Sequence, residues 1–231
     1  RLSDGTAIAG RGVFEHCVIV GEVAKQLLAL IPSSLRKKLF PAGTELLAAA
    51  HDIGKVSVRF QNKLKKAMDS RLMLNGDDRN WNGHGGVTFL TLLELINEKS
   101  AVAAGQHHGC YPHLAKTEII DPEHSELLGG EGYHSQRLAL IEALKTHFQT
   151  DFPILANEQQ VLAVSGLITV ADWIGSGELF EDPNQNWQQF ITPAILQAGY
   201  QALTIRSDLS FETIFGFKSH SAQQQLFEQV N

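Results

Sequence analysis

The stretch that decides the fold is "TELLAAAHDIG", residues 44–54. Its run of Leu and Ala favours a buried helix, with Thr44 expected as the N-cap and Gly54 as the terminator. Such a helix carries His51 and Asp52 into the interior at its C-terminal end. Because single His and Asp residues mostly serve packing and capping, this pair alone does not identify a site.

The rest of the chain repeats the helical pattern. Apolar residues recur every three or four positions in five further ranges, which are 13–31, 87–96, 100–109, 135–148 and 157–176. The first range stops at Pro32, and the last has Asn157 as its expected cap. No stretch alternates apolar and polar residues as a strand would, so we expect a single all-α domain.

Two other segments carry breaks in this pattern. Residues 109–133 are rich in Gly, Pro, Glu and His, which predicts a long loop or broken helices. Over 182–203 a helix is expected to begin with Asp182 as cap and Pro183 at its first position. Pro193 should kink or split that helix.

Composition restricts the class of protein. With 231 residues and 43% hydrophobic content, the chain can bury a substantial core. Its apolar runs are too short to cross a bilayer and it lacks a signal pattern, so we expect a soluble, cytoplasmic protein without a membrane partner. Nineteen Lys plus Arg against 25 Asp plus Glu give a net charge of −6, which argues against a wide basic surface for nucleic acid.

Two cysteines far apart suggest neither a disulfide framework nor a thiolate zinc site. The chain begins with Arg rather than Met, so we expect it to be part of a longer one.

Histidines and aspartates lie on or at the ends of the predicted helices. His16 lies on the apolar stripe of 13–31, and Asp172 lies on that of 157–176, where an unpaired carboxylate would be costly. His84 is flanked by glycines. His107 and His108 can reach one ion only where their helix ends, because adjacent helical residues point about 100° apart.

Together these residues predict a metal centre. The full set is His16, His51, Asp52, His84, His107, His108 and Asp172. Seven ligands are too many for one tetrahedral zinc and suit two ions bridged by a carboxylate. Mixed imidazole and carboxylate ligands favour Fe, Mn, Co, Ni or Zn over Mg.

The same residues resemble a known superfamily. His16, His51, Asp52 and Asp172 match the H...HD...D signature of the HD-domain metal-dependent phosphohydrolases. Three stretches resemble one branch, the HD nuclease domain of the CRISPR-associated nuclease-helicase of type I systems. They are "HDIGKVSVRFQNKL" (51–64), "GQHHG" (105–109) and "ADWIGS" (171–176). The resemblance implies an HD-domain helical bundle with a buried metal site.

It also implies roles for individual residues. One ion would be held by His16, His51, Asp52 and Asp172, and the other by His84, His107 and His108 with Asp52 bridging. The implied reaction is hydrolysis of single-stranded DNA by a metal-activated hydroxide. His51, Asp52 and Lys55 are then the expected catalytic residues, with Lys55 holding a phosphate oxygen or stabilising charge. Ser176 is expected to contact substrate or orient a ligand.

The resemblance further implies a division of the chain and its partners. Residues 1–208 form the expected HD nuclease domain, and 209–231 resemble the segment that leads to a C-terminal helicase in cis. In the family, the helicase-nuclease degrades DNA in type I CRISPR interference. An RNA-guided surveillance complex bound to target DNA recruits it.

Three alternatives remain open at this point. A cyclic di-GMP phosphodiesterase of the HD-GYP type shares "HDIGK" and a later histidine pair, but Gly109 to Pro112 lack the acidic residue and the DGxGYP run expected there. A single-metal nucleotide phosphohydrolase would leave His84, His107 and His108 without a purpose. A non-enzymatic helical adaptor would use the metal only as a structural staple.

Several weaker features have ordinary explanations. Basic clusters at 35–39 and 63–67 are typical of solvated faces, although the second follows the HD motif closely and is a candidate DNA path. Trp173 is expected in the core. The remaining histidines, His113, His124, His134, His147 and His220, are expected to be structural or solvated.

Overall fold

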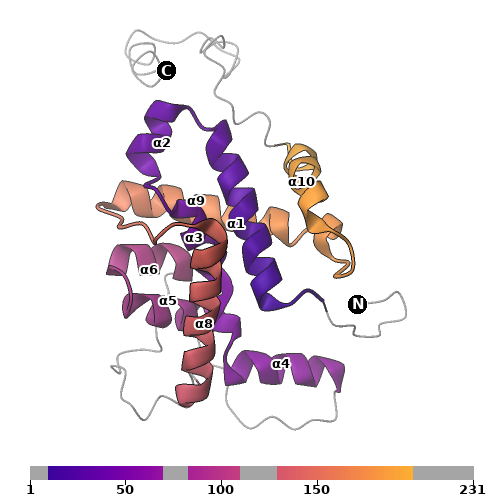
Figure 1. The fold of residues 1–231 in the computed structure, drawn as a ribbon. Helices are drawn as coiled ribbons and strands as arrows, with labels where there is room; N and C mark the ends of the chain where they lie inside the picture. Colours follow the sequence, from indigo (N-terminus) through magenta and orange to yellow (C-terminus); the bar gives the residue numbers. More distant parts are fainter. Residues whose placement is uncertain (1–9, 70–82, 110–128, 200–231) are drawn as a thin grey trace.

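The protein is helical throughout the part of the chain that the structure, a computed structural model, describes (Figure 1). This part comprises residues 10–69, 83–109 and 129–199, and no strand occurs in it. The expected all-α architecture is therefore confirmed. The elements are α1 Val13–Leu30, α2 Ser33–Leu39, α3 Thr44–Ala49, the 3₁₀ helix η1 Ala50–Lys55, α4 Val58–Met68, α5 Gly83–Leu93, α6 Glu98–Gly105, α8 Gly130–Phe148, α9 Glu158–Gly175, the short 3₁₀ helices η4 Glu178–Phe180 and η5 Trp187–Phe190, and α10 Ile191–Gln197.

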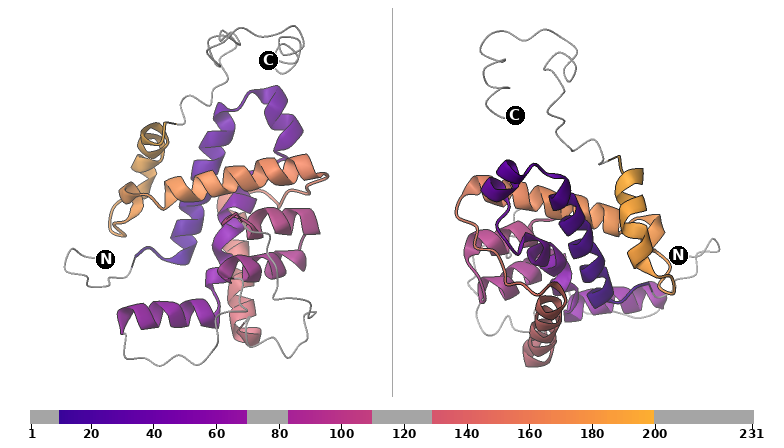
Figure 2. Two further views of the ribbon diagram at one scale, coloured as in Figure 1. Left: turned by 180° about the vertical axis from the view of Figure 1, so that it is seen from behind. Right: turned by 45° about the horizontal axis from the view of Figure 1, so that its top comes forward.

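Helix α1 lies at the centre of the bundle. Helices α3 and α9 pack against it, and α9 crosses it in the views of Figures 1 and 2. Helix α5 packs on both η1 and α6, and α6 in turn packs on α9. Helix α4 projects away from the bundle at the end of η1, and none of its residues is buried. The elements that carry the expected ligands therefore pack on one another in the bundle.

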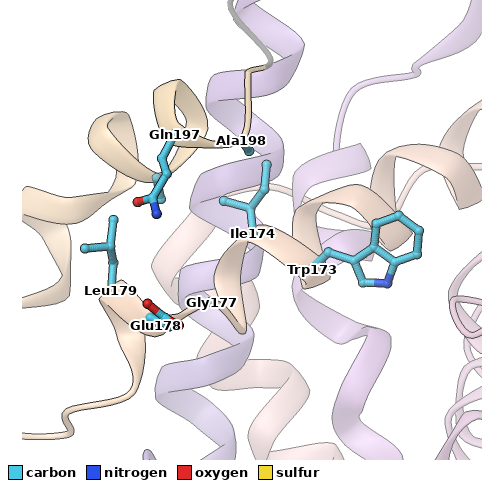
Figure 3. A pocket seen from close by; sticks show the side chains of 8 residues that line it. Trp173, Ile174, Gly177, Glu178, Leu179, Gln197 and Ala198 are labelled. Carbon is cyan, nitrogen blue, oxygen red and sulfur yellow. The ribbon is translucent and has the colours of Figure 1, made fainter.

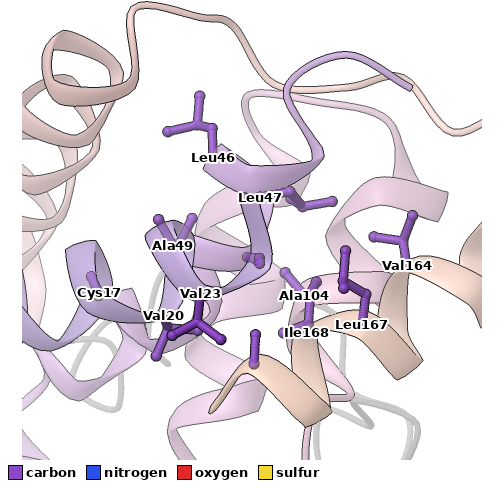
Figure 4. Close-up of a cluster of buried hydrophobic side chains, with 14 of the residues drawn as sticks. Cys17, Val20, Val23, Leu46, Leu47, Ala49, Ala104, Val164, Leu167 and Ile168 are labelled. Atoms are coloured by element: carbon purple, nitrogen blue, oxygen red, sulfur yellow. The ribbon is translucent and has the colours of Figure 1, made fainter. Parts of the chain in front are cut away.

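The hydrophobic core explains this arrangement. Apolar side chains of α1, α3, α6 and α9 converge in Figure 4, where Val20, Leu47, Ala104 and Ile168 lie close together. All four side chains are fully buried. Because each Å² of buried apolar surface contributes about 25 cal/mol to the free energy of folding, this cluster is the main source of stability. Among the described helices, none is both long and apolar enough to cross a membrane.

Two predicted helices have the expected ends. Helix α1 stops at Leu30, two residues before Pro32. Helix α9 is capped by Asn157, whose side chain accepts a hydrogen bond from the backbone N–H of Gln160.

The helix predicted over 44–54 differs from the observed one in two ways. Its N-cap is Gly43, with a φ of +88°, and Thr44 is already helical; the Thr44 hydroxyl instead donates to the carbonyl of Pro41. From Ala50 onward the chain winds as a 3₁₀ helix. In this turn the backbone carbonyl of His51 and the backbone N–H of Gly54 form hydrogen bonds with Thr88 of α5. Tertiary contacts therefore contribute to its conformation in addition to local helix propensity.

The boundaries of α5 and α6 also differ from the prediction. Helix α5 begins at Gly83 rather than residue 87, which places His84 in its first turn. Helix α6 begins at Glu98, with the Asn97 side chain as cap, and ends at Gly105. The backbone has therefore left the helix before it reaches the histidine pair.

The prediction for 109–133 was wrong at its end, because α8 begins at Gly130; residues 110–128 lie outside the described part of the chain. Glycines are tolerated in a first turn, and Glu131 there complements the helix dipole.

The helix predicted over 182–203 was wrong in its start. The Asp182 side chain accepts from the N–H of Asn184 in a turn instead of capping a helix. Regular structure begins only with η5. Pro193 does not kink α10 because it is the third residue of that helix, where an N–H has no intrahelical partner. Residues 200–203 lie outside the described part.

Candidate metal centre

The seven predicted ligands come together in the structure from five segments. His16 lies on α1, His51 and Asp52 on η1, His84 on α5, and Asp172 on α9, while the histidine pair follows α6. Two groups form, and within each group one ligand atom per residue lies within 4.8 Å of all the others. The first group is His16, His51, Asp52 and Asp172, and the second is His84, His107 and His108.

Asp52 lies between the two groups. Its Oδ2 is 3.0 Å from Nε2 of His16 and 3.2 Å from Nε2 of His51. Its other oxygen, Oδ1, is 3.0 Å from Nε2 of His84 and 3.7 Å from Nε2 of His107. The carboxylate is 1% exposed and directs one oxygen to each group. This is the geometry of a bridging ligand.

The remaining distances complete both groups. Asp172 Oδ1 lies 3.4 Å from Nε2 of His16 and 3.3 Å from Nε2 of His51. Nε2 of His84 lies 2.9 Å from Nε2 of His108 and 3.3 Å from Nε2 of His107. Two ligands about 2.1 Å from a common ion lie roughly 3.0–3.4 Å apart, so both groups have the dimensions of a coordination sphere.

Hydrogen bonding fits the same interpretation. Nδ1 of His51 lies 2.8 Å from the carbonyl of Ala48, and Nδ1 of His107 lies 2.8 Å from that of Ala104. A carbonyl only accepts, so both Nδ1 atoms donate, and each ring can present the lone pair of Nε2. Within the described residues, Nε2 of His16 and His51 and both Asp52 oxygens are buried without a hydrogen bond, although Oδ2 of Asp52 forms an ion pair with Lys55. Buried polar atoms without partners are costly, and a metal ion would satisfy all four.

Two glycines let the ligand-bearing elements approach each other. A Cβ on Gly54 would clash with the carbonyl oxygen of His84, so η1 lies directly against the backbone of α5 at a predicted ligand. A Cβ on Gly85 would lie 2.5 Å from the carbonyl oxygen of Gly105, at the end of α6. Larger residues would push apart the segments that carry Asp52, His84 and the histidine pair.

The buried charges shift the pKa values of several predicted ligands. Burial disfavours a charged His51, but the carboxylates of Asp52 and Asp172 outweigh it and raise the pKa of His51 to about 10. Burial opposes ionisation of Asp52 as well, yet His51, His16 and His84 hold the pKa of Asp52 well below its usual range. Metal binding needs a neutral imidazole, so an ion and a proton compete for His51.

The histidine pair of the second group differs from His51. Burial, followed by repulsion from His51, lowers the pKa of His107 to about 3. Burial and the neighbouring His84 also lower the pKa of His108. Neutral imidazoles are the form that binds metal.

Lys55 and Ser176 both contact the first group. The Lys55 ammonium pairs with Oδ2 of Asp52, and its side chain is 24% exposed. Ser176 is exposed, and its hydroxyl donates to Oδ1 of Asp172 over 3.0 Å. Ser176 therefore contacts a predicted ligand, as one of the two expected roles requires.

Sequence reasoning missed several neighbours of the site. The Phe60 ring lies edge-on to His84, with ring centroids 5.4 Å apart. The Thr169 hydroxyl lies 2.9 Å from the carbonyl oxygen of His107. Buried Thr88 contacts the backbone of the HD motif. Thr88 lies one helical turn after His84, and that i, i+4 spacing is a signal that could have found it.

Trp173 corrects another expectation, because it is 68% exposed rather than in the core. Asp172 points inward, and the next residue of a helix points about 100° away. Trp173 lines an open pocket of about 370 Å³ between the end of α9, η4 and α10 (Figure 3). Ile174, Leu179 and Ala194 give the pocket an apolar lining, and none of the seven predicted ligands lines it.

The other histidines in the described part of the chain belong to different surroundings. His147 lies 3.1 Å from Glu22 of α1, and His134 lies 3.7 Å from Glu94. These contacts agree with the expected structural or solvated roles. His113, His124 and His220 lie outside the described residues.

Solved structures share this fold. The Thermus thermophilus Cas3 HD domain, crystallised in the presence of Ni²⁺, is 23% identical with a TM-score of 0.59, covering 83% of this chain and 86% of that one. T. fusca Cas3 with ADP is 20% identical with a TM-score of 0.58, covering 83% of this chain. A chain of a CRISPR RNA-guided surveillance complex in a pre-nicking state is 20% identical with a TM-score of 0.61, covering all of this chain.

The length of the relatives varies. This chain spans 24% of the T. fusca protein and 30% of the chain in the surveillance complex. No curated protein matches the sequence. The family model for the HD domain of Cas3 matches residues 4–180, which include all seven predicted ligands. The expected HD-domain bundle is thus confirmed, and the chain belongs to the Cas3 HD-domain family.

Proposed function

We propose that the protein is a metal-dependent nuclease that hydrolyses phosphodiester bonds of single-stranded DNA at a two-metal centre. The observation that carries this proposal is the Asp52 carboxylate, whose two oxygens face two separate ligand groups. A bridging carboxylate is what a pair of ions needs to stay close together. The seven residues of the two groups are the proposed ligands.

The proposed chemistry divides between the ions and the chain. Divalent ions held there would supply positive charge and an activated nucleophile for phosphodiester hydrolysis. The chain fixes the rings of His51 and His107 through their Nδ1 hydrogen bonds, so that Nε2 has one orientation. Lys55 places a partly exposed ammonium beside Asp52, where a phosphate oxygen would carry negative charge.

The ligand types favour transition metals. Five imidazoles against two carboxylates suit Fe, Mn, Co, Ni or Zn better than Mg, which prefers oxygen ligands. The related domain from Thermus thermophilus was crystallised in the presence of Ni²⁺, one of these metals.

We further propose that α4 carries part of the DNA path. The helix follows the HD motif directly, and its Phe60 contacts His84. Lys63 and Lys66 are exposed one turn apart on α4, so their ammonium groups share a face. A local basic face of this kind attracts phosphates even though the chain has a net charge of −6.

The proposal also covers the division of the chain into domains and the partners of the nuclease domain. Residues 1–208 form the nuclease domain, and 209–231 lead toward a C-terminal helicase in cis. The degradation step belongs to type I CRISPR interference, with recruitment by an RNA-guided surveillance complex. Its support is the family and the relatives, which include the much longer T. fusca Cas3 and a chain of a surveillance complex.

The test is cleavage of circular single-stranded DNA by protein loaded with Mn²⁺, Co²⁺ or Ni²⁺, with cyclic di-GMP offered in parallel. We expect the circle to be cut, and Asp52→Ala to abolish cutting. Asp151→Ala is the matched control, since Asp151 is an exposed aspartate away from both groups. Hydrolysis of cyclic di-GMP without cleavage of the DNA circle would contradict the nuclease proposal and indicate a cyclic dinucleotide phosphodiesterase. Bound metal without any turnover would indicate a structural staple.

A further inference from the structure

Thr88 links helix α5 to the backbone of η1, which carries Asp52. It lies on α5, one turn after His84, and is fully buried. Its Oγ1 lies 2.8 Å from the carbonyl oxygen of His51, to which it donates. The same atom accepts from the backbone N–H of Gly54 over 3.0 Å. One hydroxyl thus holds both ends of the turn that carries Asp52.

We propose that Thr88 is a positioning residue that sets how the Asp52 carboxylate is shared between the two metal positions. Asp52 sits inside the turn His51 to Gly54, so the orientation of that turn fixes where Oδ1 and Oδ2 point. Helix α5 carries His84, whose Nε2 lies 3.0 Å from Oδ1. The hydroxyl therefore ties the bridging ligand to the helix of the second group. This inference rests on the two-metal centre proposed above.

Chemistry makes the role specific to the hydroxyl. A buried hydroxyl that both donates and accepts has no replacement in an apolar side chain, and burial keeps water from substituting. Without it, the His51 carbonyl and the Gly54 N–H lose their link to α5. The turn is then held against α5 by packing alone, so we expect the position of Asp52 relative to His84 to be less fixed and ion binding to weaken at the second group before the first.

Thr91 provides a matched comparison on the same helix. It is 2% exposed, and its hydroxyl donates to the carbonyl of Val87 within α5. Replacing either threonine by valine removes one buried hydroxyl at nearly constant volume. Only the change at Thr88 removes a link between η1 and α5.

The test is Mn²⁺ titration by calorimetry, combined with electron paramagnetic resonance of the loaded protein. We expect Thr88→Val to weaken binding of the second ion by about tenfold and to diminish the signal of spin-coupled Mn²⁺ pairs. Thr88→Ser should restore both, and Thr91→Val should leave both near the wild-type values. Circular dichroism of the metal-free variants checks folding, and Thr88→Ala replaces Thr88→Val if the latter does not fold.

Two outcomes would overturn the inference. One is wild-type affinity and coupling in Thr88→Val, and the other is an equal loss in Thr91→Val, which would indicate general packing. Failure of the two-metal proposal is distinguishable, because the wild-type protein itself would then bind a single ion and show no coupled signal.

Discussion

Lys55 illustrates how much one residue of the HD motif depends on its neighbours. Its ammonium pairs with Oδ2 of Asp52, the oxygen that faces His16 and His51. The Lys55 backbone is also fixed, because Gln61 of α4 donates its side-chain amide to the Lys55 carbonyl. The amino group thus lies beside the predicted ligands without belonging to either group.

Lys55→Met tests the role of that charge. We expect metal affinity to stay within a few-fold of the wild type, whereas the cleavage rate falls by about 10²-fold because charge stabilisation on the phosphate is lost. Calorimetry and single-turnover cleavage measure the two effects separately. Lys25→Met, which removes an exposed lysine paired with Glu22, is the control. If metal affinity and cleavage rate fell by the same factor, Lys55 would act only through its contact with Asp52.

Packing between elements decides whether the ligands meet. Helix α5 approaches η1 closely enough that Gly54 contacts the His84 carbonyl, and α5 meets the end of α6 at Gly85. The ligand groups are therefore products of helix contacts rather than of any one helix.

Gly54→Ala should separate η1 from α5. A Cβ there has no room, so we expect the free energy of unfolding to fall by about 1–3 kcal/mol or more and Mn²⁺ binding to weaken. Gly166→Ala is the control, because Gly166 lies exposed in α9 with no atom within 4 Å of a new Cβ. That change should stabilise the protein by about 1 kcal/mol through helix propensity. Urea unfolding measures both, and equal stability of the two variants would contradict the expectation.

The lysines of helix α4 are expected to contribute to DNA binding. The double variant Lys63→Ala/Lys66→Ala should weaken binding of single-stranded DNA and lower the slope of log affinity against log salt by about 0.7 per lost phosphate contact. Lys37→Ala/Lys38→Ala removes the same charge from exposed positions on α2, at the other end of the molecule in Figure 1. Fluorescence anisotropy at several salt concentrations compares them. Equal effects would mean that net charge, and not α4, governs binding.

The sequence allowed much of this architecture to be predicted, with identifiable exceptions. The long apolar periodicity predicted the bounds of α1 and α9 to within one residue. It also placed His16 and Asp172 on the inner faces of these helices, so they could be predicted to lie near each other. Helix α4 was not predicted, although Phe60, Leu64 and Met68 recur along it at the four-residue spacing of one helix face; the structure buries none of its residues, so this face does not join the core. The 3₁₀ winding of η1 occurs where Thr88 of α5 binds its backbone, and a contact between segments so far apart in the sequence is not encoded by any local pattern.

At the scale of the whole molecule, the metal centre would act as a cross-link. Its proposed ligands lie on elements from α1 to α9, and these elements form the bundle. An ion that binds only the folded form stabilises it by mass action, at about 2.7 kcal/mol when its concentration is 100 times Kd. The stability of the bundle should therefore depend on metal.

Metal removal tests this coupling. Chelation should lower Tm by about 5–10 °C per ion, given about 2–4 °C per kcal/mol for a domain of this size. Asp172→Asn should reduce the metal-dependent part of Tm, whereas His147→Gln, far from the ligand groups in sequence and paired with Glu22, should not. Thermal unfolding followed by circular dichroism gives the values. An unchanged Tm after complete chelation would show that the ions do not support the fold.

The order of the ligands along the chain has a consequence for biosynthesis. The residues of the second group are all present once His108 has been synthesised, but the first group lacks its last carboxylate until Asp172 of α9 follows. A nascent or prematurely terminated chain that ends before α9 therefore lacks a complete centre and should be unable to cut nucleic acid. We therefore expect the proposed nuclease activity only of chains whose synthesis has passed Asp172.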